Sequence, residues 1–291
     1  MDERESLRAI YEWLPEAGDD AAVVDGLIFT TDMLHQTSDF PQGTTRYTAG
    51  WRAVGASLSD IAAMGAEATA AIAVYAAPEF DGDELHSFIR GAQAVCELTD
   101  SRYVGGDLDQ HEEFTVASSA IGRTESPILR STASPGEVVC VTGTLGRTGA
   151  ALRLFEQNDH ERANSLFQFE PRVATGLAVA PYATAMMDSS DGLARSLHQL
   201  AEASECGFAI EWDRVPVDET VRETATSRAE EREFSLYTGE DFELVFTIPS
   251  DGIDSARNAT SIPISVVGDV TEKEVTIDGD PLPDRGYTHG R

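Results

Sequence analysis

Residues 184–204 read TAMMDSSDGLARSLHQLAEAS. A short apolar run ends at Asp188, and a polar turn leads through Asp191 to leucines at 193, 197 and 200, which have helical spacing. The pattern predicts a strand, a tight turn and a helix, with Ser190 as the N-cap and Asp191 in the first turn, where a carboxylate suits the helix dipole. Local structure explains Asp188 less easily. Two carboxylates at one junction are ligands that Mg²⁺ uses together with substrate phosphates.

Other aspartates repeat this arrangement at turns or near the ends of predicted elements, beside Gly, Ser or Thr. Residues 21–24 and 27–31 are predicted to pair as strands around an Asp25-Gly26 turn, which places Asp20 and Asp32 at the same end of the hairpin. Residues 47–64 have a helical pattern that carries Asp60, although a helical aspartate on its own usually faces solvent. The repetition of the motif, more than any one member, indicates a metal site.

Two glycine-rich segments are candidates for close contact with a ligand. Gly105-Gly106 precedes Asp107 after a predicted strand, and paired glycines let the backbone approach a bound group; a plain turn is the alternative. Residues 143–149 lie between a predicted strand (137–142) and a predicted helix (150–155), where backbone N–H groups could hold phosphate. The spacing there is GxxGxxG and no GxxxxGK[ST] occurs in the chain, so a structural loop explains this segment equally well.

Composition limits the class of protein. The 291 residues favour two domains, and a hydrophobic content of 41% suffices for packed cores. The net charge is −30, and Lys273 is the single lysine. Such a surface repels nucleic acid and resembles those of proteins from salt-rich cytoplasm, where at about 1 M salt a Debye length of roughly 3 Å screens self-repulsion. We therefore expect a halophilic protein that binds no nucleic acid.

Neither a disulfide framework nor a membrane anchor is predicted. Cys96, Cys140 and Cys206 are widely spaced and form no CxxC pair, as expected of core residues in a reducing compartment. The first residues lack the pattern of a signal peptide, and no apolar run approaches the roughly 20 residues of a membrane span. The sequence thus predicts a cytoplasmic protein, with domains at 1–133 and 134–291 divided at the STASPG segment, residues 131–136.

The candidate carboxylates define a chemistry. The chain has no Cys/His pattern with metal-ligand spacing and no Walker lysine, and its scattered histidines give no basis for a Ser-His-Asp triad. A site made of carboxylates suits phosphoryl transfer, in which Mg²⁺ ions neutralise the phosphates. From the residues alone, the prediction is an enzyme that handles phosphate with several Mg²⁺ ions.

The order of motifs along the chain resembles one enzyme family. From about residue 18 to residue 287 it runs GDDAAVV, TTDML, SLSDIAAMGAE, GGD, VTGTLGRTGAAL, MMDSSDGL, TGEDFELVFTIP and VVGDV. This set is similar to the thiamine-monophosphate kinase family, within the superfamily of aminoimidazole ribonucleotide synthetase-like ATP-binding enzymes. LSDIAAMGA and GEDFELVF are specific to that family, whereas GGD and SDGL are shared more widely.

The resemblance implies an activity, a fold and an assembly. The reaction would be ATP-dependent phosphorylation of thiamine monophosphate to thiamine diphosphate, by direct in-line transfer with several Mg²⁺ ions; whether K⁺ is also needed is left open. The implied fold is α+β and PurM-like, with two mixed-sheet domains. The N-terminal domains of two subunits would pair in a β-barrel homodimer, and the site would lie in the cleft between the domains.

The resemblance also implies roles for individual residues. Substrate contacts would come from Glu240, Tyr287 and Asp39, although Asp39 stands where the family usually has a histidine, so that either Asp39 or His35 could serve there. Positions matching the nucleotide contacts are Gly106, Asp107, Arg130 and Ser190. Positions matching the Mg²⁺ ligands are Asp20, Thr30, Thr31, Asp32, Asp60, Asp107, Asp188 and Asp191.

Two alternatives stay open. One is another synthetase of the superfamily, such as selenophosphate synthetase or a hydrogenase-maturation protein. These normally carry a reactive cysteine near the N-terminus or at the C-terminus, and here the first cysteine is Cys96. The other is a non-catalytic paralogue that binds Mg²⁺ and nucleotide as a sensor, whose signature would be ATP binding without turnover.

Overall fold

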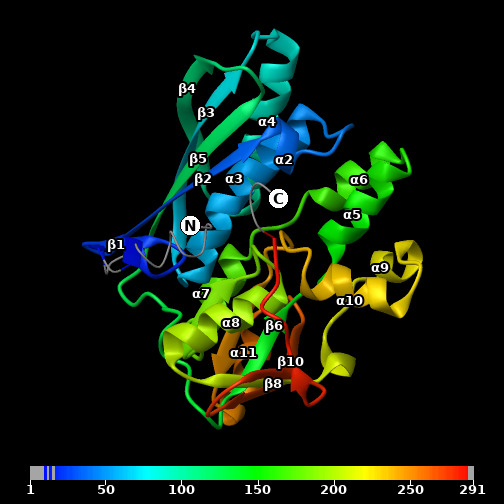
Figure 1. Ribbon diagram of the computed structural model, residues 1–291. Helices are drawn as coiled ribbons and strands as arrows, with labels where there is room; N and C mark the ends of the chain where they lie inside the picture. Colours follow the sequence, from blue (N-terminus) through cyan, green and yellow to red (C-terminus); the bar gives the residue numbers. More distant parts are fainter. Residues whose placement is uncertain (1–9, 12, 15–16, 288–291) are drawn as a thin grey trace.

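The computed structural model describes residues 10–11, 13–14 and 17–287, which form two α+β units, each built on one sheet (Figure 1). The N-terminal sheet has five strands and the C-terminal sheet seven, and both mix parallel and antiparallel pairs. The predicted α+β class with two mixed-sheet units is therefore confirmed. No helix among the described residues has the length and apolar character to cross a bilayer.

The N-terminal sheet has the order β1-β2-β5-β3-β4. Its strands are β1 (Ala22–Val24), β2 (Leu27–His35), β3 (Glu67–Ala77), β4 (Arg102–Gln110) and β5 (Thr115–Arg123). Strand β1 turns into β2 at Asp25-Gly26, as predicted, and both turn residues have positive φ. One row across the sheet joins Asp32, Ser118, Ala73 and Gly106.

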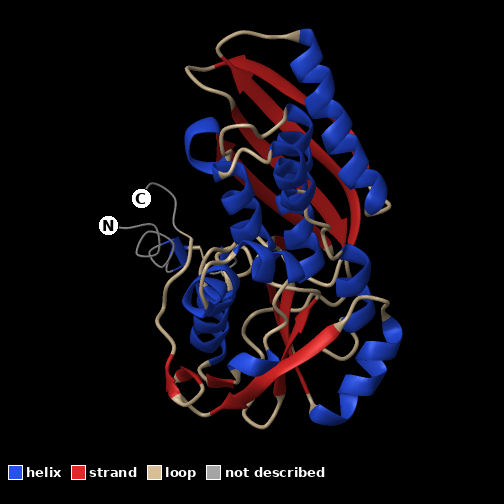
Figure 2. Cartoon of the chain, turned by 90° about the vertical axis from the view of Figure 1, so that its right-hand side faces the viewer, coloured by secondary structure: helices blue, strands red, loops and turns tan. Residues whose placement is uncertain are grey.

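Helices cover one face of this sheet (Figure 2). They are α2 (Gln36–Asp39), α3 (Arg46–Ala63) and α4 (Gly82–Leu98). Helices α3 and α4 cross where both lack side chains, since a Cβ on Gly50 would lie 2.1 Å from the Phe88 carbonyl oxygen and one on Gly91 would lie 1.9 Å from that of Tyr47. This close crossing holds α3, which carries Asp60, firmly against the sheet.

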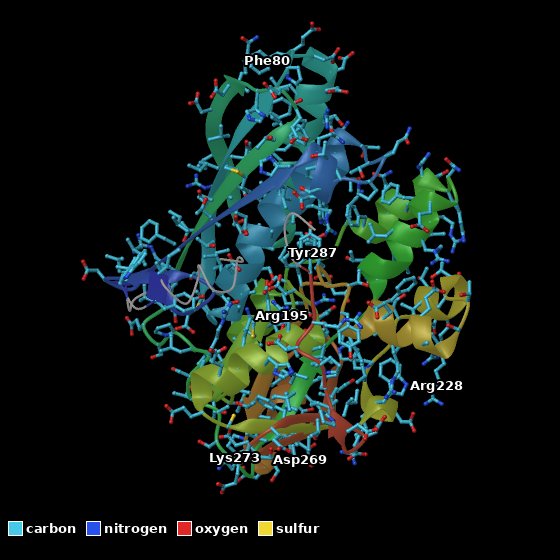
Figure 3. The ribbon with its side chains drawn as sticks, in the orientation of Figure 1. Phe80, Arg195, Arg228, Asp269, Lys273 and Tyr287 are labelled. Carbon is cyan, nitrogen blue, oxygen red and sulfur yellow. The ribbon has the colours of Figure 1, made fainter. Side chains whose placement is uncertain are left out.

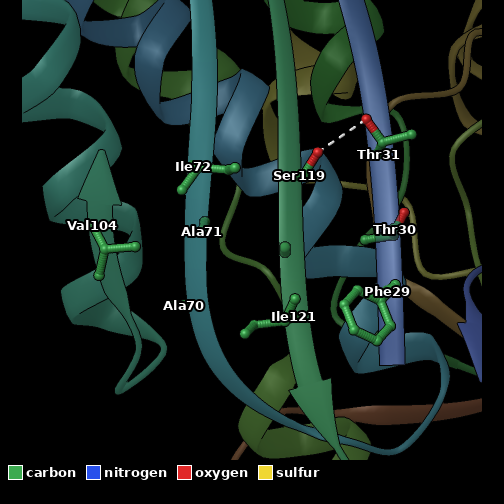
Figure 4. A pocket seen from close by; sticks show the side chains of 10 residues that line it. Phe29, Thr30, Thr31, Ala70, Ala71, Ile72, Val104, Ser119 and Ile121 are labelled. Atoms are coloured by element: carbon green, nitrogen blue, oxygen red, sulfur yellow. Dashed lines mark hydrogen bonds between the residues drawn. The ribbon is translucent and has the colours of Figure 1, made fainter. Parts of the chain in front are cut away.

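The other face of the N-terminal sheet is open. Its apolar side chains include Phe29, Met33, Ile72, Val74 and Val104, all of which are exposed. Figure 4 shows a hollow on this face, with Phe29, Ile72, Val104 and Ile121 around it and Thr31 bonded to Ser119 at its rim. One face of the sheet is buried and the other is apolar and exposed. Monomeric proteins rarely expose such an apolar face, which is typical of an interaction surface.

The C-terminal sheet has the order β12-β11-β8-β10-β6-β9-β7. Its strands are β6 (Val138–Thr142), β7 (Ala185–Asp188), β8 (Gly207–Ile210), β9 (Leu244–Ile248), β10 (Ile264–Thr271), β11 (Val275–Ile277) and β12 (Asp280–Pro281). The helices of this unit are α5 (Arg147–Glu156), α6 (His160–Phe167), α7 (Val173–Val179), α8 (Leu193–Ser204), α9 (Glu219–Thr224), α10 (Arg228–Leu236) and α11 (Ile253–Ala259). Lys273 is exposed in the β10–β11 turn, at the end of this unit far from Tyr287 (Figure 3).

Three local predictions were wrong. Helix α8 begins at Leu193 after Gly192 (φ 97°), so Ser190 is not its N-cap and Asp191 precedes its first turn. Strand β2 continues to His35, which puts Asp32 inside the strand rather than at its end. Gly105 and Gly106 lie within β4 and not in a turn; a Cβ on Gly106 would meet the Ala73 carbonyl oxygen at 1.7 Å, so the neighbouring strand requires glycine there.

Candidate functional site

Three predicted ligands meet at the junction of the two units. Asp20 precedes β1, Asp60 lies in the last turn of α3, and Asp188 ends β7. One carboxylate oxygen from each lies within 4.8 Å of the others. We call these three residues, with the neighbouring Asp32, the acidic cluster. Strand β7 and helix α3, 128 positions apart at these aspartates, thus bring carboxylates to one point.

Hydroxyl groups and one arginine hold the acidic cluster in place. Ser59 Oγ donates to Asp188 Oδ2 at 2.5 Å, and the Thr30 hydroxyl donates to Asp60. Arg130 donates two hydrogen bonds to Asp20, one from Nη2 to Oδ1 at 2.6 Å and one from Nε to Oδ2 at 3.1 Å. Burial lowers the pKa of Arg130, but the ion pair with Asp20 outweighs this and raises it. The arginine therefore stays charged and offsets one of the four carboxylates.

The carboxylates of the acidic cluster repel one another. Burial raises the pKa of Asp60 well above its usual range, and repulsion from Asp32, Asp188 and Asp20 raises it further. Burial and the charge of Asp20 likewise raise the pKa of Asp188. Asp188 Oδ1 is buried with no hydrogen-bond partner among the described residues. An unpartnered carboxylate oxygen among like charges fits a hard divalent cation, so the donor set suits Mg²⁺.

Other predicted ligands lie outside the acidic cluster. Thr30 and Asp32 share the face of β2 with the buried Ile28, whereas Thr31 lies on the open face and bonds to Ser118 and Ser119. Gly106 and Asp107 lie on β4, three strands from β2, which is about 14 Å at the usual strand spacing. In the described chain, therefore, neither Thr31 nor Asp107 joins the acidic cluster.

The predicted substrate-contact residues form a second group. The Tyr287 hydroxyl donates to Asp39 Oδ1 at 2.6 Å, and Arg52 Nη2 donates to Glu240 Oε2 at 2.8 Å. Burial raises the pKa of Tyr287, and the hydrogen bond to Asp39 and the charge of Glu240 raise it further. These four residues, Asp39, Arg52, Glu240 and Tyr287, are called the acceptor cluster below. Figure 3 shows Tyr287 between the two units, above Arg195.

The structure also separates the two candidates in the acceptor loop. Asp39 is buried, and its Oδ2 accepts from the His35 N–H at 2.6 Å. The His35 ring is turned instead toward Thr115, with Nδ1 3.1 Å from Oγ1. Asn164 of α6 anchors the following loop through the Thr45 N–H and the Gly43 carbonyl, both at 2.9 Å. Asp39, and not His35, is therefore the loop side chain in the acceptor cluster.

The turn after Asp188 links the two groups. The Ser190 carbonyl accepts from the Glu240 N–H at 2.6 Å, and the Asp191 carbonyl accepts from the Tyr287 N–H at 3.0 Å. One short turn thus delivers Asp188 to the acidic cluster and fixes two members of the acceptor cluster through its backbone. The turn therefore joins the acidic cluster to the acceptor cluster.

The GEDFE segment, residues 239–243, serves several structural purposes. Asp241 accepts from the N–H groups of Gly146 (2.5 Å) and Thr148 (2.9 Å), so a carboxylate of the chain itself occupies the N-terminus of α5. Burial raises the pKa of Asp241 to about 7. Glu243 forms a buried ion pair with Arg172 at 2.6 Å. The glycine-rich segment 143–149 is thus a structural loop, the second of the two explanations considered for it.

Sequence reasoning missed Arg52 and Ser59. Both lie in α3, and their partners Glu240 and Asp188 are 188 and 129 positions away. Ser59 adjoins a predicted ligand, which is a weak signal. For Arg52 nothing local distinguishes it from the other arginines of the chain.

Comparison with known proteins places the fold and the site in a family. Residues 18–124 match the AIR synthase related protein, N-terminal domain, and residues 134–279 match the AIR synthase related protein, C-terminal domain. The chain belongs to this family of two-domain proteins. Within it, the thiamine-monophosphate kinase of Halobacterium salinarum is 56% identical over 291 residues, covering 99% of this chain and 100% of the relative. That of Methanospirillum hungatei is 39% identical and covers 99% of both. The chain is accordingly an enzyme of the thiamine-monophosphate kinase group.

Solved structures agree with this placement. The structure described as "AaThiL complexed with AMPPCP and TMP" has a TM-score of 0.88 at 27% identity, covering 99% of this chain and 97% of that chain. Hydrogenase maturation protein HypE has a TM-score of 0.73 at 18% identity, covering 94% and 93%. At that identity HypE shows a shared fold and nothing about activity.

Proposed function

We propose that this protein phosphorylates thiamine monophosphate with ATP to give thiamine diphosphate and ADP, by direct in-line transfer with several Mg²⁺ ions. The observation that carries the proposal is the turn at residues 188–191, which joins the acidic cluster to the acceptor cluster. Relatives that are thiamine-monophosphate kinases, and a similar structure described as holding AMPPCP and TMP, support the choice of substrates.

The residues divide the work as follows. Asp20, Asp32, Asp60 and Asp188, with the Thr30 hydroxyl, would hold Mg²⁺, which neutralises the phosphates of both substrates. The acceptor phosphate is already an anionic nucleophile, so no general base is required. Arg130 keeps Asp20 oriented, and the acceptor cluster positions the organic part of the substrate. Positioning and charge neutralisation are then the main contributions of the protein to the rate.

We place the nucleotide beside Gly106 and Asp107. A hollow at these residues is walled by apolar and aromatic side chains, among them Leu85, Ile89 and Tyr103. Such a wall suits a purine base, and the carboxylate of Asp107 at its edge suits a metal ion on the phosphates. The remaining predicted positions, Ser190, Asp191 and Thr31, stay proposals from the family resemblance.

We also propose the homodimer. The open apolar face of the N-terminal sheet would be covered if two sheets paired, as in the predicted barrel. Gly106, the residue before Asp107, lies in the same row of the sheet as Asp32, but on the edge strand β4, three strands away. In a dimer, Asp107 of one subunit could therefore complete the acidic cluster of the other. A cytoplasm rich in salt remains the proposed setting, because of the net charge of −30.

The test is a product assay. Purified protein is mixed with ATP, Mg²⁺ and thiamine monophosphate in molar KCl, with NaCl in parallel to test for K⁺, and thiamine diphosphate is followed by chromatography. Equal yields of thiamine diphosphate and ADP are expected. ADP without thiamine diphosphate would discard the acceptor and favour another synthetase of the superfamily. Tight ATP binding without turnover would favour the non-catalytic sensor.

A further inference from the structure

We propose that Arg52 is a positioning residue for the acceptor, acting through Glu240, and that it decides how tightly the organic substrate binds without affecting ATP. The inference rests on the proposed function. No sequence motif contains this residue, and it belongs to the acceptor cluster and not to the acidic cluster.

Arg52 is held on every side. Its side chain is 2% exposed. Nη1 donates to the Phe167 carbonyl at 2.6 Å, Nη2 donates to Glu240 at 2.8 Å, and the guanidinium lies 3.6 Å above the centre of the Phe167 ring. A planar group bonded at both ends and stacked on an aromatic ring has one orientation. Arg52 can therefore fix the direction of the Glu240 carboxylate.

Glu240 needs this support because its backbone is strained. Its φ is 56°, and Phe242 two residues later has a φ of 54°, so two side-chain-bearing residues of one turn are left-handed. The Ser190 carbonyl holds the Glu240 N–H, and the Thr148 hydroxyl donates to the Glu240 carbonyl at 2.8 Å. Those bonds fix the backbone, and Arg52 fixes the side chain.

The charges of the acceptor cluster point to the kind of ligand. Asp39 and Glu240 contribute two carboxylates, and Arg52 forms an ion pair with Glu240 at 2.8 Å. Burial lowers the pKa of Arg52, and its neighbours Glu240, Asp241 and Asp39 oppose that effect, so the guanidinium stays protonated. The carboxylates of Asp39 and Glu240 are groups that suit the positively charged thiazolium ring of thiamine monophosphate.

The experiment is a double-mutant cycle on the full-length protein. Arg52→Met keeps most of the aliphatic stem and removes the charge, Arg52→Lys keeps the charge without the fork, and Glu240→Gln removes the partner. The Michaelis constants for thiamine monophosphate and for ATP are measured for each variant and for the double variant. Arg153→Met is the matched control, since Arg153 is also an arginine paired with a glutamate, Glu230, and lies near a phenylalanine ring.

We expect Arg52→Met to raise the KM for thiamine monophosphate by about tenfold to hundredfold, the range for losing one charge-assisted hydrogen bond. The KM for ATP should stay within about twofold, Arg52→Lys should recover part of the loss, and Arg153→Met should change neither constant. The double variant should be no worse than Glu240→Gln alone. Thermal unfolding of every variant establishes that it is folded.

Two results would overturn the inference. In the first, the effects of Arg52→Met and Glu240→Gln multiply in the double variant, which would mean that Arg52 does not act through Glu240. In the second, both Michaelis constants rise together in Arg52→Met and in Arg52→Lys, which would indicate a general structural role. Failure of the proposed function itself looks different, because the wild-type protein would then make no thiamine diphosphate.

Discussion

The acidic cluster and the acceptor cluster lie at the two ends of one turn and solve opposite electrostatic problems. The acidic cluster gathers four carboxylates around one arginine and leaves a buried oxygen of Asp188 without a hydrogen-bond partner among the described residues. In the acceptor cluster each carboxylate has a named donor, Tyr287 for Asp39 and Arg52 for Glu240. The carboxylates of the first repel one another and suit a cation, whereas those of the second are paired with donors of the chain itself. The comparison suggests that the acidic cluster requires a bound cation, whereas the acceptor cluster selects the organic substrate.

The largest expected effect tests the acidic cluster, together with Asp191, which the family resemblance implies as a further ligand. Asp32→Asn, and separately Asp191→Asn, should reduce kcat by more than about a hundredfold while leaving the fold intact, because losing a metal ligand damages the transition state more than the core. The measurement is steady-state turnover beside circular dichroism. Near-normal activity in both variants would contradict the site assignment.

The next largest effect concerns Asp241, the residue that follows Glu240 of the acceptor cluster, and its contribution to stability. The buried Asp241 has a raised pKa of about 7, so the folded state favours its protonated form. Its contribution to the free energy of unfolding is fully present below about pH 4 and is lost as the pH rises to about 7, by on the order of 2–4 kcal/mol.

Denaturant unfolding of wild type and Asp241→Asn between pH 5 and 8 measures this contribution. The stability of the wild type relative to the variant should fall as the pH rises. A constant difference across that range would show that Asp241 keeps an ordinary pKa in the folded protein.

Metal binding should distinguish the two clusters directly. Mg²⁺ at about a hundred times its dissociation constant should stabilise the wild type by about 2.7 kcal/mol, or roughly 5–10 °C in Tm. Asp60→Asn should lose most of this gain, and Glu240→Gln should keep it. Equal gains in the two variants would mean that Mg²⁺ binds elsewhere.

The smallest expected effect tests the hydroxyl of Tyr287. Tyr287→Phe removes one hydrogen bond to Asp39 and should raise the KM for thiamine monophosphate by about fivefold, equivalent to roughly 1 kcal/mol. The variant Tyr237→Phe is a control on a neighbouring tyrosine. An unchanged KM in Tyr287→Phe would remove that hydroxyl from the pocket.

Sequence patterns predicted the strand, turn and helix around Asp188 and the hairpin around Asp25-Gly26, the length of the chain favoured two domains, and the family resemblance implied their α+β class. They also predicted aspartates that the structure brings together, because apolar periodicity marks the element ends where Asp20, Asp60 and Asp188 lie. The start of α8 was missed because Gly192, with a positive φ, occupies the N-cap position. Ser190 therefore lies two residues before that position and does not cap the helix. Arg52 was missed because its role arises only when α3 meets a turn 188 positions later.

The position of Lys273 has a practical consequence. It is the single lysine of the chain, and it is exposed in the β10–β11 turn, far from Tyr287 (Figure 3). Apart from the α-amino group, amine-reactive reagents therefore have one side chain to modify. A dye or a sensor surface coupled there would leave both clusters accessible, so substrate binding could be followed on a uniformly oriented layer of protein.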